Sequence, residues 1–316
     1  MSAPAATGPA TVSVVVCAYT LQRLDDLVAA CTALGRQTRV PDEVVLVVDH
    51  CPPLVEAAAR RLPGVRVVQN AGPRGLSGAR NHGTAVTTGD VVLFLDDDAV
   101  PEATWVEALC RPFEDGDVVG VGGWAEAAWD SPGCPSWFPR PFLWVVGCSY
   151  EGLPADGADL RNPIGAAMGF RREALLAVGG FPDGVGRVGT HPVGCEETEL
   201  SIRVRRRSPG ARIVHQRSAV VRHRVRAERR SLRYFARRCY WEGRSKAIVA
   251  GSVGSTDALS SERSYALRTL PAAALAGPAG FARSGDPALL LQSAALLVGL
   301  VCTVTGFTTG KVVARG

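Results

Sequence analysis

The fold is decided by the stretch VVLFLDDDAVP, residues 91–101. Its first five residues are continuously apolar, which is typical of a strand buried on both faces of a parallel sheet. Asp96, Asp97 and Asp98 follow that strand directly. Ligands bind at the carboxyl ends of the strands in an open parallel sheet. Three acids crowded there repel one another unless a cation lies among them, so the stretch predicts a site for Mg²⁺ or Mn²⁺.

A simpler interpretation of the same acids is the start of a helix. Negative side chains are favoured near helix N-termini, and we expect a helix over 101–113 that is opened by Pro101 in its first turn. That interpretation accounts for Asp98 but leaves three acids at the end of an apolar strand unexplained. The metal site is therefore preferred.

The chain around this strand alternates apolar runs with helical patterns. The expected strands are 12–17, 43–48, 65–68 and 118–122, and the expected helices between them are 24–34, 54–62 and 77–86. Continuously apolar strands separated by helices indicate an α/β fold, with a Rossmann-like, mostly parallel sheet covered by helices on both faces.

The second half of the chain is less regular. Between Trp124 and Pro163 the pattern dissolves into Trp, Pro, Gly and Asp, which indicates a loop region on the substrate side. Order then resumes. The expected elements are an ordered segment at 166–170, helices at 172–178 and 196–206, short strands at 212–215 and 219–221, and a long basic helix at 231–250.

Composition excludes several classes of protein. With 47% hydrophobic and 21% charged residues, the 316-residue chain is a folded globular protein rather than a disordered one. Its nine cysteines form no CxxC pair, which fits a reduced, cytoplasmic chain. The first apolar run, 12–17, is too short for the core of a signal peptide. Fourteen arginines and one acid between Arg203 and Arg238 favour an anionic partner, although a solvated basic surface is the ordinary alternative.

The C-terminal region is apolar enough to meet a membrane. Between Asp286 and Lys311 lie 24 consecutive uncharged residues, and a membrane span needs about 20. A single span would place Lys311 and Arg315 outside, against the positive-inside tendency. A hairpin that enters and returns avoids this, and a buried or interfacial helix pair is the alternative without a span. We expect membrane association.

Two further segments carry candidate binding residues. Asp49 follows the strand at 43–48, where its carboxylate could accept hydrogen bonds from a nucleotide, although a turn aspartate is equally ordinary there. The segment NAGPRGLSGARN, residues 70–81, has glycines that allow close backbone approach, and Arg80 can reach a phosphate. It is neither a P-loop nor a dinucleotide fingerprint, so ATP hydrolysis and NAD chemistry lose support.

A run of acids, CEETEL at 195–200, opens the helix expected at 196–206. It is either a simple complement to the helix dipole or the source of a catalytic base. Considered together with Asp96–Asp98, it supplies a carboxylate that could remove a proton from an acceptor hydroxyl.

In combination these motifs resemble the family 2 glycosyltransferases of the GT-A fold. The resemblance covers about residues 12 to 245 and is specific because the pieces occur jointly and in this order. They are VSVVVCAYTLQR at 12–23, PDEVVLVVD at 41–49, GLSGARNHG at 75–83, VVLFLDDDAVP at 91–101, MGFRREALLAVGGF at 168–181 and GCEETELSIR at 194–203.

The resemblance implies roles for the donor residues. Asp96 and Asp98 match the outer acids of the family's DxD motif, which holds the metal, Mn²⁺ or Mg²⁺, and the donor diphosphate. Ala18, Tyr19 and Asp49 match the positions that cradle the nucleoside.

Three more residues are assigned by the same resemblance. Arg80 matches a residue near the ribose and phosphate, and Glu197 matches the general base of the family's xED motif. The chain departs from the usual pattern at Glu197, since aspartate is more common there. His223 stands where several members place a histidine near the metal, although a lone histidine among arginines is as often a surface residue.

The implied activity is a metal-dependent, inverting transfer of a sugar from a nucleotide-diphosphate donor to a hydroxyl or phosphate, in bacterial cell-envelope glycan or glycolipid synthesis. The expected acceptor is a glycan, a polyprenyl phosphate or a glycolipid, and no nucleic acid is expected. The mixture of arginine and aromatic residues in 233–247, RYFARRCYWEGRSKA, would suit a phosphate-bearing or lipid-linked acceptor. We expect the enzyme at the cytoplasmic face of the cell membrane.

The expected organisation is a GT-A catalytic domain over 1–250 and a helical, hydrophobic appendage over 251–316. The catalytic domain would have a donor half at about 10–123 and an acceptor half at about 124–250.

Two alternatives stay open. A sugar-phosphate nucleotidyltransferase should have a Gly-rich, basic loop after its first strand, and CAYTLQR at 17–23 is not one. A nucleic-acid-binding or membrane-binding protein could use the basic region Arg203–Arg238 with its neighbouring aromatics, but would leave the three aspartates unexplained.

Overall fold

The computed structural model describes residues 10–182, 194–253 and 270–313, so parts of the expected ranges (1–9, 183–193, 254–269 and 314–316) lie outside the described residues. The strands are β1 (Val12–Ala18), β2 (Glu43–Val48), β3 (Arg66–Gln69), β4 (Val91–Asp96), β5 (Ala99–Pro101), β6 (Val118–Trp129), β7 (Ala167–Arg171) and β8 (Arg212–Val225). The helices are α1 (Leu24–Leu34), α2 (Pro52–Arg61), α3 (Leu76–Val86), α4 (Trp105–Cys110), α5 (Arg172–Ala177), α6 (Glu196–Arg207), α7 (Leu232–Val253), α10 (Leu270–Ser284) and α11 (Pro287–Val313). Short 3-10 helices are η1 (Leu21–Arg23), η2 (Arg111–Glu114), η3 (Arg140–Val146) and η4 (Ala227–Arg230).

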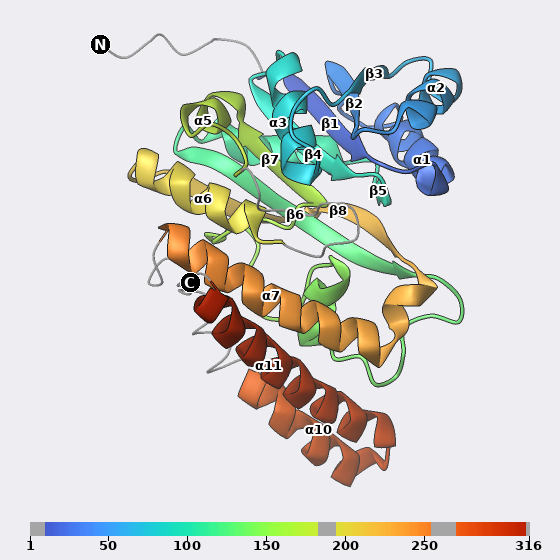
Figure 1. Ribbon diagram of the computed structural model, residues 1–316, viewed down its shortest axis with the longest axis vertical. Helices are drawn as coiled ribbons and strands as arrows, with labels where there is room; N and C mark the ends of the chain where they lie inside the picture. Colours follow the sequence, from blue (N-terminus) through green and yellow to red (C-terminus); the bar gives the residue numbers. More distant parts are fainter. Residues whose placement is uncertain (1–9, 183–193, 254–269, 314–316) are drawn as a thin grey trace.

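All eight strands belong to one sheet, in the order β3-β2-β1-β4-β7-β6-β8-β5 (Figure 1). Strands β3, β2, β1 and β4 are parallel, and β6 and β8 are parallel. Strand β7 runs antiparallel between β4 and β6, and β5 is antiparallel to β8. The α/β fold expected from the sequence is confirmed, and β7 marks the boundary between its two parallel groups.

The central strands are apolar on both faces, which explains the two layers of helices. Strand β1 is buried along its whole length, and β4 is buried except at its last residue. Leu93 and Leu95 pack on one face with Leu27 of α1 and Trp105 of α4. Phe94 packs on the opposite face, in the cluster that also holds residues of α3, α5 and α6. Because both faces are covered, the only open place along β4 is its carboxyl end, where Asp96 stands.

The prediction of a helix over 101–113 is wrong at its beginning. Ala99–Pro101 form β5, and α4 begins only at Trp105. Pro101 is tolerated because a proline, which has no N–H to donate, fits a strand at the edge of a sheet. The strand pairs Ala99 with His223 of β8. This pairing therefore brings His223 next to the aspartates.

Two other expectations underestimate the strands. Strand β6 continues seven residues past Gly122 to Trp129, and the two short strands expected at 212–215 and 219–221 are parts of the single strand β8. The two strands pair along their length, with shifts of register between Val118 and Gly120 and between Gly122 and Trp124. Their outer halves alternate buried and exposed residues, which weakens the apolar signal in the sequence.

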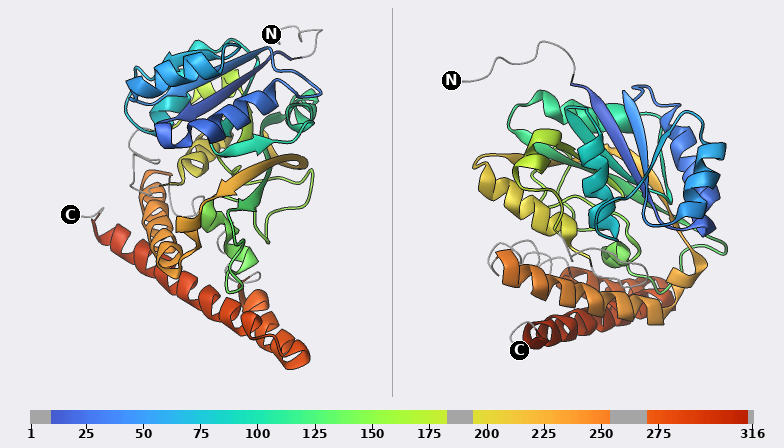
Figure 2. Two further views of the ribbon diagram at one scale, coloured as in Figure 1. Left: turned by 90° about the vertical axis from the view of Figure 1, so that its right-hand side faces the viewer. Right: turned by 45° about the horizontal axis from the view of Figure 1, so that its top comes forward.

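The C-terminal part is a helix pair packed on α7. Helices α10 and α11 form a hairpin around Gly285, whose φ is +70°. Both figures of the ribbon show α11 lying along α7 on the side away from the sheet (Figures 1 and 2). Among the described residues, one helix, Pro287–Lys311, is long and apolar enough to cross a membrane. Only 17% of its most apolar 18-residue stretch is buried.

Candidate functional site

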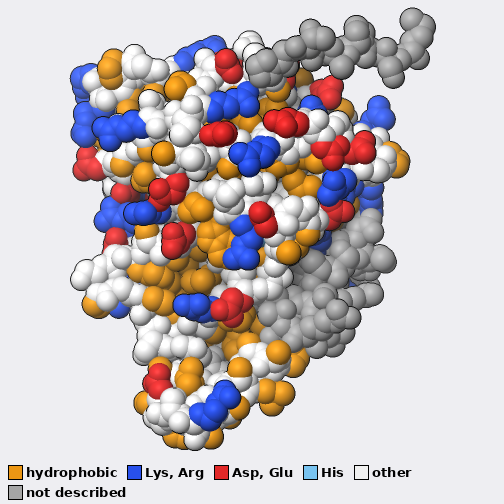
Figure 3. All heavy atoms as spheres, turned by 180° about the vertical axis from the view of Figure 1, so that it is seen from behind, with side chains coloured by type: hydrophobic (Ala, Val, Ile, Leu, Met, Phe, Trp, Pro, Cys, Tyr) orange, Lys and Arg blue, Asp and Glu red, His pale blue; other side chains and the backbone are white. Residues whose placement is uncertain are grey.

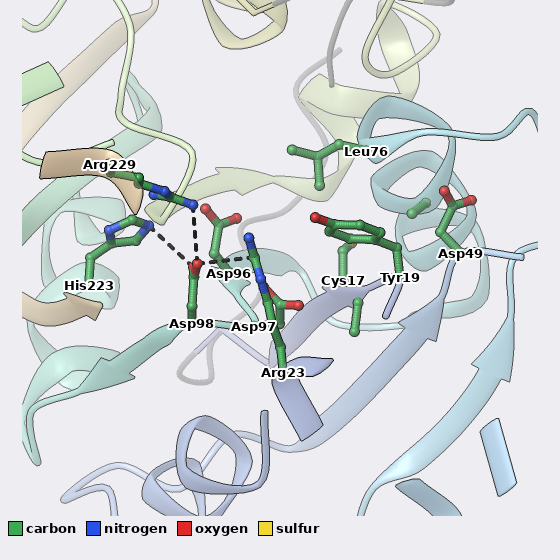
Figure 4. A pocket seen from close by; sticks show the side chains of 12 residues that line it. Cys17, Tyr19, Arg23, Asp49, Leu76, Asp96, Asp97, Asp98, His223 and Arg229 are labelled. Carbon is green, nitrogen blue, oxygen red and sulfur yellow. Dashed lines mark hydrogen bonds and ion pairs between the residues drawn. The ribbon is translucent and has the colours of Figure 1, made fainter. Parts of the chain in front are cut away.

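A pocket opens at the carboxyl ends of β1 and β4 (Figure 4). Its wall comes from five parts of the chain: the end of β1 with η1, the residue after β2, the start of α3, the three aspartates, and β8 with η4. The residues in the wall are Cys17, Ala18, Tyr19, Arg23, Asp49, Leu76, Ala79, Asp96, Asp97, Asp98, His223 and Arg229. Ala18, Tyr19, Asp49, Asp96, Asp98 and His223, which the sequence singled out, are thus brought together.

Three of these residues form a cluster with the chemistry of a metal site. Asp96, Asp98 and His223 each offer one ligand atom, and these atoms lie within 4.8 Å of one another. Two carboxylates and an imidazole suit Mn²⁺ and are compatible with Mg²⁺, and such sites commonly share the ion with substrate phosphates. The buried Oδ2 of Asp98 accepts no hydrogen bond of regular geometry, although the guanidinium of Arg23 lies 3.0 Å from it. The residues present therefore fit a divalent cation.

Asp98 is the centre of the charges in the pocket (Figure 4). Its side chain is 3% exposed, and its oxygens face His223 Nε2 at 3.2 Å, Arg23 Nη1 at 3.0 Å and Arg229 Nη2 at 3.6 Å. Burial disfavours the charged carboxylate, but His223 and the two arginines outweigh it and hold the pKa of Asp98 well below its usual range. Burial disfavours the charged imidazole, but the charge of Asp98, and next Cys148, outweigh it and raise the pKa of His223 to about 10. Cys148 contacts the other ring nitrogen, Nδ1, at 3.6 Å and so helps to orient the imidazole toward Asp98.

Asp97 is buried in the same pocket and shares the guanidinium of Arg23 with Asp98. It accepts a hydrogen bond from Arg23 at 2.8 Å. Burial, and next the charge of Asp98, raise the pKa of Asp97 to about 7 although Arg23 opposes the shift. The guanidinium of Arg23 also lies 5.5 Å from the centre of the Tyr19 ring. Arg23 thus bridges two acids and an aromatic side of the pocket.

Arg80 stands behind the pocket rather than in its wall. Its side chain is 2% exposed and lies 3.2 Å from Glu196 and Glu197 and 3.5 Å from Asp96. It also donates to the Gly165 carbonyl at 3.3 Å. Arg80 therefore links the end of β4 to the start of α6, where the acid run lies.

Glu197, one of the acids around Arg80, has a shifted pKa. Burial, and next the neighbouring charge of Glu196, raise the pKa of Glu197 to about 8, and Arg80 opposes that rise. Its side chain is 16% exposed. A carboxylate whose pKa lies near neutrality can exchange a proton with a hydroxyl group, which is the property that a general base needs.

Asp49 has a structural role in the pocket. Its carboxylate accepts hydrogen bonds from Asn70 Nδ2 at 2.7 Å and from the Gly75 N–H at 2.9 Å. The loop at 70–75 is thereby tied to the end of β2. Gly75 has φ of +123°, a conformation that favours glycine, and it leads into α3. The loop and Asp49 form one side of the pocket together.

Four residues of the site were missed by the sequence reasoning. Arg23 and Arg229 pair with Asp98, Glu196 pairs with Arg80, and Gly165 lies against both Arg80 and Glu197. Arg229 is one of fourteen arginines in its region, and nothing in the sequence distinguishes it from the others. Arg23 closes the CAYTLQR motif, and its place one turn after β1 was the available signal.

Comparison with known proteins identifies the family of the chain. Residues 13–179 match the model of the family described as "Glycosyl transferase family 2". The chain belongs to this family. The pocket lies at the carboxyl ends of β1 and β4, where ligands bind in open α/β sheets. The nucleotidyltransferase and the non-catalytic binding protein lose their support, since the chain is a glycosyltransferase.

Individual relatives extend the match. The glycosyltransferase is 33% identical over 242 residues to a glucosyl-dolichyl phosphate glucuronosyltransferase of Haloferax volcanii, which covers 75% of this chain and 77% of that protein. Its fold is similar to that of a mannosyltransferase from Pyrobaculum calidifontis in complex with GDP-Man and Mn²⁺, with a TM-score of 0.55, 19% identity and coverage of 94% and 88%. It is also similar to GalNAc-T7 with UDP, GalNAc and Mn²⁺, with a TM-score of 0.52, 16% identity and coverage of 77% and 51%. The GT-A fold expected from the resemblance is confirmed.

Proposed function

We propose that this glycosyltransferase moves a sugar from a nucleotide-diphosphate donor to a lipid-linked acceptor, with inversion at the anomeric carbon, in cell-envelope synthesis. The observation that carries the proposal is the cluster of Asp96, Asp98 and His223 in the wall of the pocket at the ends of β1 and β4. The lipid-linked acceptor is supported by the Haloferax volcanii relative, whose name places its chemistry on a dolichyl phosphate.

Asp96, Asp98 and His223 would hold Mn²⁺ or Mg²⁺ together with the donor diphosphate. The ion, when bound, supplies Lewis-acid stabilisation of the charge that develops on the leaving diphosphate. Arg23 and Arg229 lie 3.0 and 3.6 Å from the carboxylate of Asp98, so their guanidinium groups would also be placed to bind diphosphate oxygens.

Ala18, Tyr19 and Asp49 form the nucleoside side of the pocket. Ala18 is buried at the end of β1, and Tyr19 is 42% exposed, so its ring is free to contact a base or ribose. Arg80 lies behind the pocket wall, where it would orient the carboxylates of Asp96 and Glu197.

Glu197 is the proposed general base. Its carboxylate would take the proton of the acceptor hydroxyl as that oxygen attacks the anomeric carbon from the face opposite the diphosphate. A phosphate acceptor is already ionised and needs no base, so this role of Glu197 applies to a hydroxyl acceptor. We retain the division into a donor half at about 10–123 and an acceptor half at about 124–250 as a proposal, in which the second half also contributes His223 and Arg229 to the wall of the donor pocket.

The proposed location is the cytoplasmic face of the cell membrane. It is supported by α11, which is long and apolar enough for membrane contact. The acceptor would then be met where a lipid-linked substrate resides.

The first experiment is a titration of the purified chain with UDP, GDP, dTDP, ADP and CDP, with and without Mn²⁺, followed by thermal unfolding. One nucleotide should stabilise the fold only with the metal, and Asp98→Ala should abolish this effect. Asp117→Ala, an exposed acid outside the pocket, is the matched control. If no nucleotide stabilises the chain, the donor site is wrong.

The second experiment concerns the base and the stereochemistry. General-base assistance contributes roughly 10²–10⁴ in rate, so Glu197→Gln should lose that much turnover on a hydroxyl acceptor while nucleotide binding persists. The anomeric configuration of the product, read by NMR, should be opposite to that of the donor. Retained configuration would contradict the single displacement.

A further inference from the structure

One face of α11 is an exposed apolar stripe. Leu290, Leu291, Leu297, Val301 and Val304 are between 38% and 64% exposed. They recur every three or four residues, together with exposed Ala294, so they share one side of the helix. In the view from behind, hydrophobic side chains are also prominent at the lower end of the molecule, where α10 and α11 lie (Figure 3). Soluble monomers rarely expose a contiguous apolar stripe of this length without a partner.

The opposite face of α11 is committed to α7. A Cβ added at Gly306 would collide with the Tyr240 carbonyl oxygen, and one added at Gly310 would lie 2.8 Å from the Ala247 Cβ. Gly243 of α7 approaches the Thr303 backbone equally closely. Small residues on both helices thus allow their backbones to meet, and α11 lies along α7 over several turns (Figure 2).

Basic side chains stand on α7, the helix that packs on the side of α11 opposite the stripe. Arg233, Arg237 and Arg244 share one side of α7, and the Arg244 Cα lies 3.2 Å from the Cβ position of Gly310 on α11. Within residues 10–182, 194–253 and 270–313, none of the three arginines has a carboxylate within 4.0 Å, while Arg244 lies over the Trp241 ring at 5.0 Å. Cations on the helix behind an apolar face are complementary to an anionic lipid surface, whose headgroups lie one layer outside the acyl chains.

We propose that α11 lies flat in the interface of an anionic phospholipid membrane, with its apolar stripe among the acyl chains and the arginines of α7 at the headgroups. The proposal deepens the membrane location given above and rests on it, but it does not depend on the transfer chemistry. The occupant of the stripe is the lipid surface and not a second protein.

A transmembrane position for α11 conflicts with its packing. Because α7 runs alongside, a spanning α11 would carry the arginines of α7 into the hydrocarbon, where charged side chains are costly. A hairpin inserted tip first is no better. Arg283 and Asp286, both exposed, stand at the turn between α10 and α11 and would reach the bilayer centre. A helix in the plane of the surface keeps every one of these charges in water or at headgroups.

The test uses the full chain and sedimentation with vesicles of phosphatidylcholine alone or with 30% phosphatidylglycerol. Leu297→Ser with Val301→Ser should lower the partition coefficient at least tenfold, because two exposed apolar side chains are lost from the interface. The control is Val40→Ser with Leu176→Ser, since these side chains are similarly exposed, at 64% and 51%, but lie elsewhere. If the two double variants bind vesicles equally, the proposal is overturned.

The headgroup contact is tested separately. Replacing Arg233, Arg237 and Arg244 by glutamine should weaken binding to the anionic vesicles by about fivefold per arginine and leave binding to neutral vesicles unchanged. Replacing three exposed arginines of the donor half, Arg36, Arg60 and Arg111, is the matched control. Equal loss in both triple variants would mean that net charge, and not these three positions, drives binding.

Depth distinguishes the flat from the spanning helix. A fluorescent amino acid placed at Leu290, Leu297 or Val304 should be quenched by doxyl lipids at one shallow depth. A spanning helix would place neighbouring probes about 10 Å apart in depth, from a rise of about 1.5 Å per residue, and that result would overturn the proposal. Nucleotide stabilisation is measured in the same variants. If nucleotide does not stabilise the wild type, the donor site alone is refuted. If the wild type does not bind vesicles, only the flat helix is refuted.

Discussion

Replacement of Arg80 by methionine should destabilise the protein more than the loss of any exposed arginine. The guanidinium is 2% exposed and is the shared partner of Glu196, Glu197 and Asp96. Methionine keeps much of the side-chain volume and removes the charge. Breaking a buried ion pair by removing one partner costs about 3–5 kcal/mol, because it leaves uncompensated charge in the interior.

The loss should also depend on pH, in a direction set by Glu197. Burial and Glu196 already raise the pKa of Glu197 to about 8 while Arg80 opposes the shift, so without Arg80 the pKa rises further. A carboxyl whose folded pKa lies above its unfolded value gives stability that is complete below the unfolded pKa and is lost as the pH rises through the folded pKa. Above pH 8, Glu197 of the folded wild type is ionised, so its contribution to the free energy of unfolding no longer changes with pH. In the variant, whose folded pKa is higher, the free energy of unfolding continues to fall by about 1.4 kcal/mol for each pH unit until the pH reaches that folded pKa.

The assay is urea unfolding of the wild type and the variant at pH 6, 8 and 9. Arg171→Met serves as the control, because Arg171 donates to backbone carbonyls and lies over the Phe113 ring, and no carboxylate of the described residues accepts a hydrogen bond from it. We expect a larger loss in Arg80→Met at every pH and a difference that grows from pH 8 to pH 9. A constant difference, or one no larger than in the control, would refute the assignment of Arg80 as the counter-ion of Glu197.

Three further outcomes follow from the geometry. Gly165→Ala places a Cβ against Glu197 Oε1 and Arg80 Nη2, so turnover should fall at least tenfold with little change in urea unfolding if only the acids move. The rate of transfer to a hydroxyl acceptor should rise with pH up to about 8 and then level, because Glu197 must be ionised to act as a base; a profile that is flat from pH 6 to pH 9 would exclude it. Gly306→Leu forces the Tyr240 carbonyl away and should detach α11 from α7, seen as faster proteolysis of the C-terminal part while nucleotide binding persists.

The parts of the fold that the sequence predicts are those with a strong local signal. The apolar run of β4 and the acids after it predict both a buried strand and the location of the site. The helix α1 and the strand β2 lie at the predicted residues, since their patterns are long or continuous and end at clear turns. These signals need no knowledge of the rest of the chain.

The parts that escape prediction depend on partners distant in sequence. Pro101 is typical of a helix start, yet the pairing with β8 makes it a strand residue. Arg229 acts on Asp98 only because η4 follows β8 and returns to the pocket. His223 was a candidate through family resemblance and not through its local pattern, which is that of an arginine-rich surface strand. Glu197 was predicted as a base, but its link to Asp96 through Arg80 is a tertiary contact that no local pattern shows.

The pairing of β5 with β8 means that the cluster of Asp96, Asp98 and His223 is completed late in the synthesis of the chain. Asp98 and His223 are 125 positions apart, and Ala99 pairs with His223. A ribosome adds about 5–20 residues per second, so His223 emerges several seconds or more after the aspartates. The first four strands can form their parallel sheet in that interval, because none of them needs β8 as a neighbour. The nascent chain therefore exposes an acidic cluster without its histidine partner for that time, and a chain truncated before β8 should fold its nucleotide side yet be unable to complete the cluster.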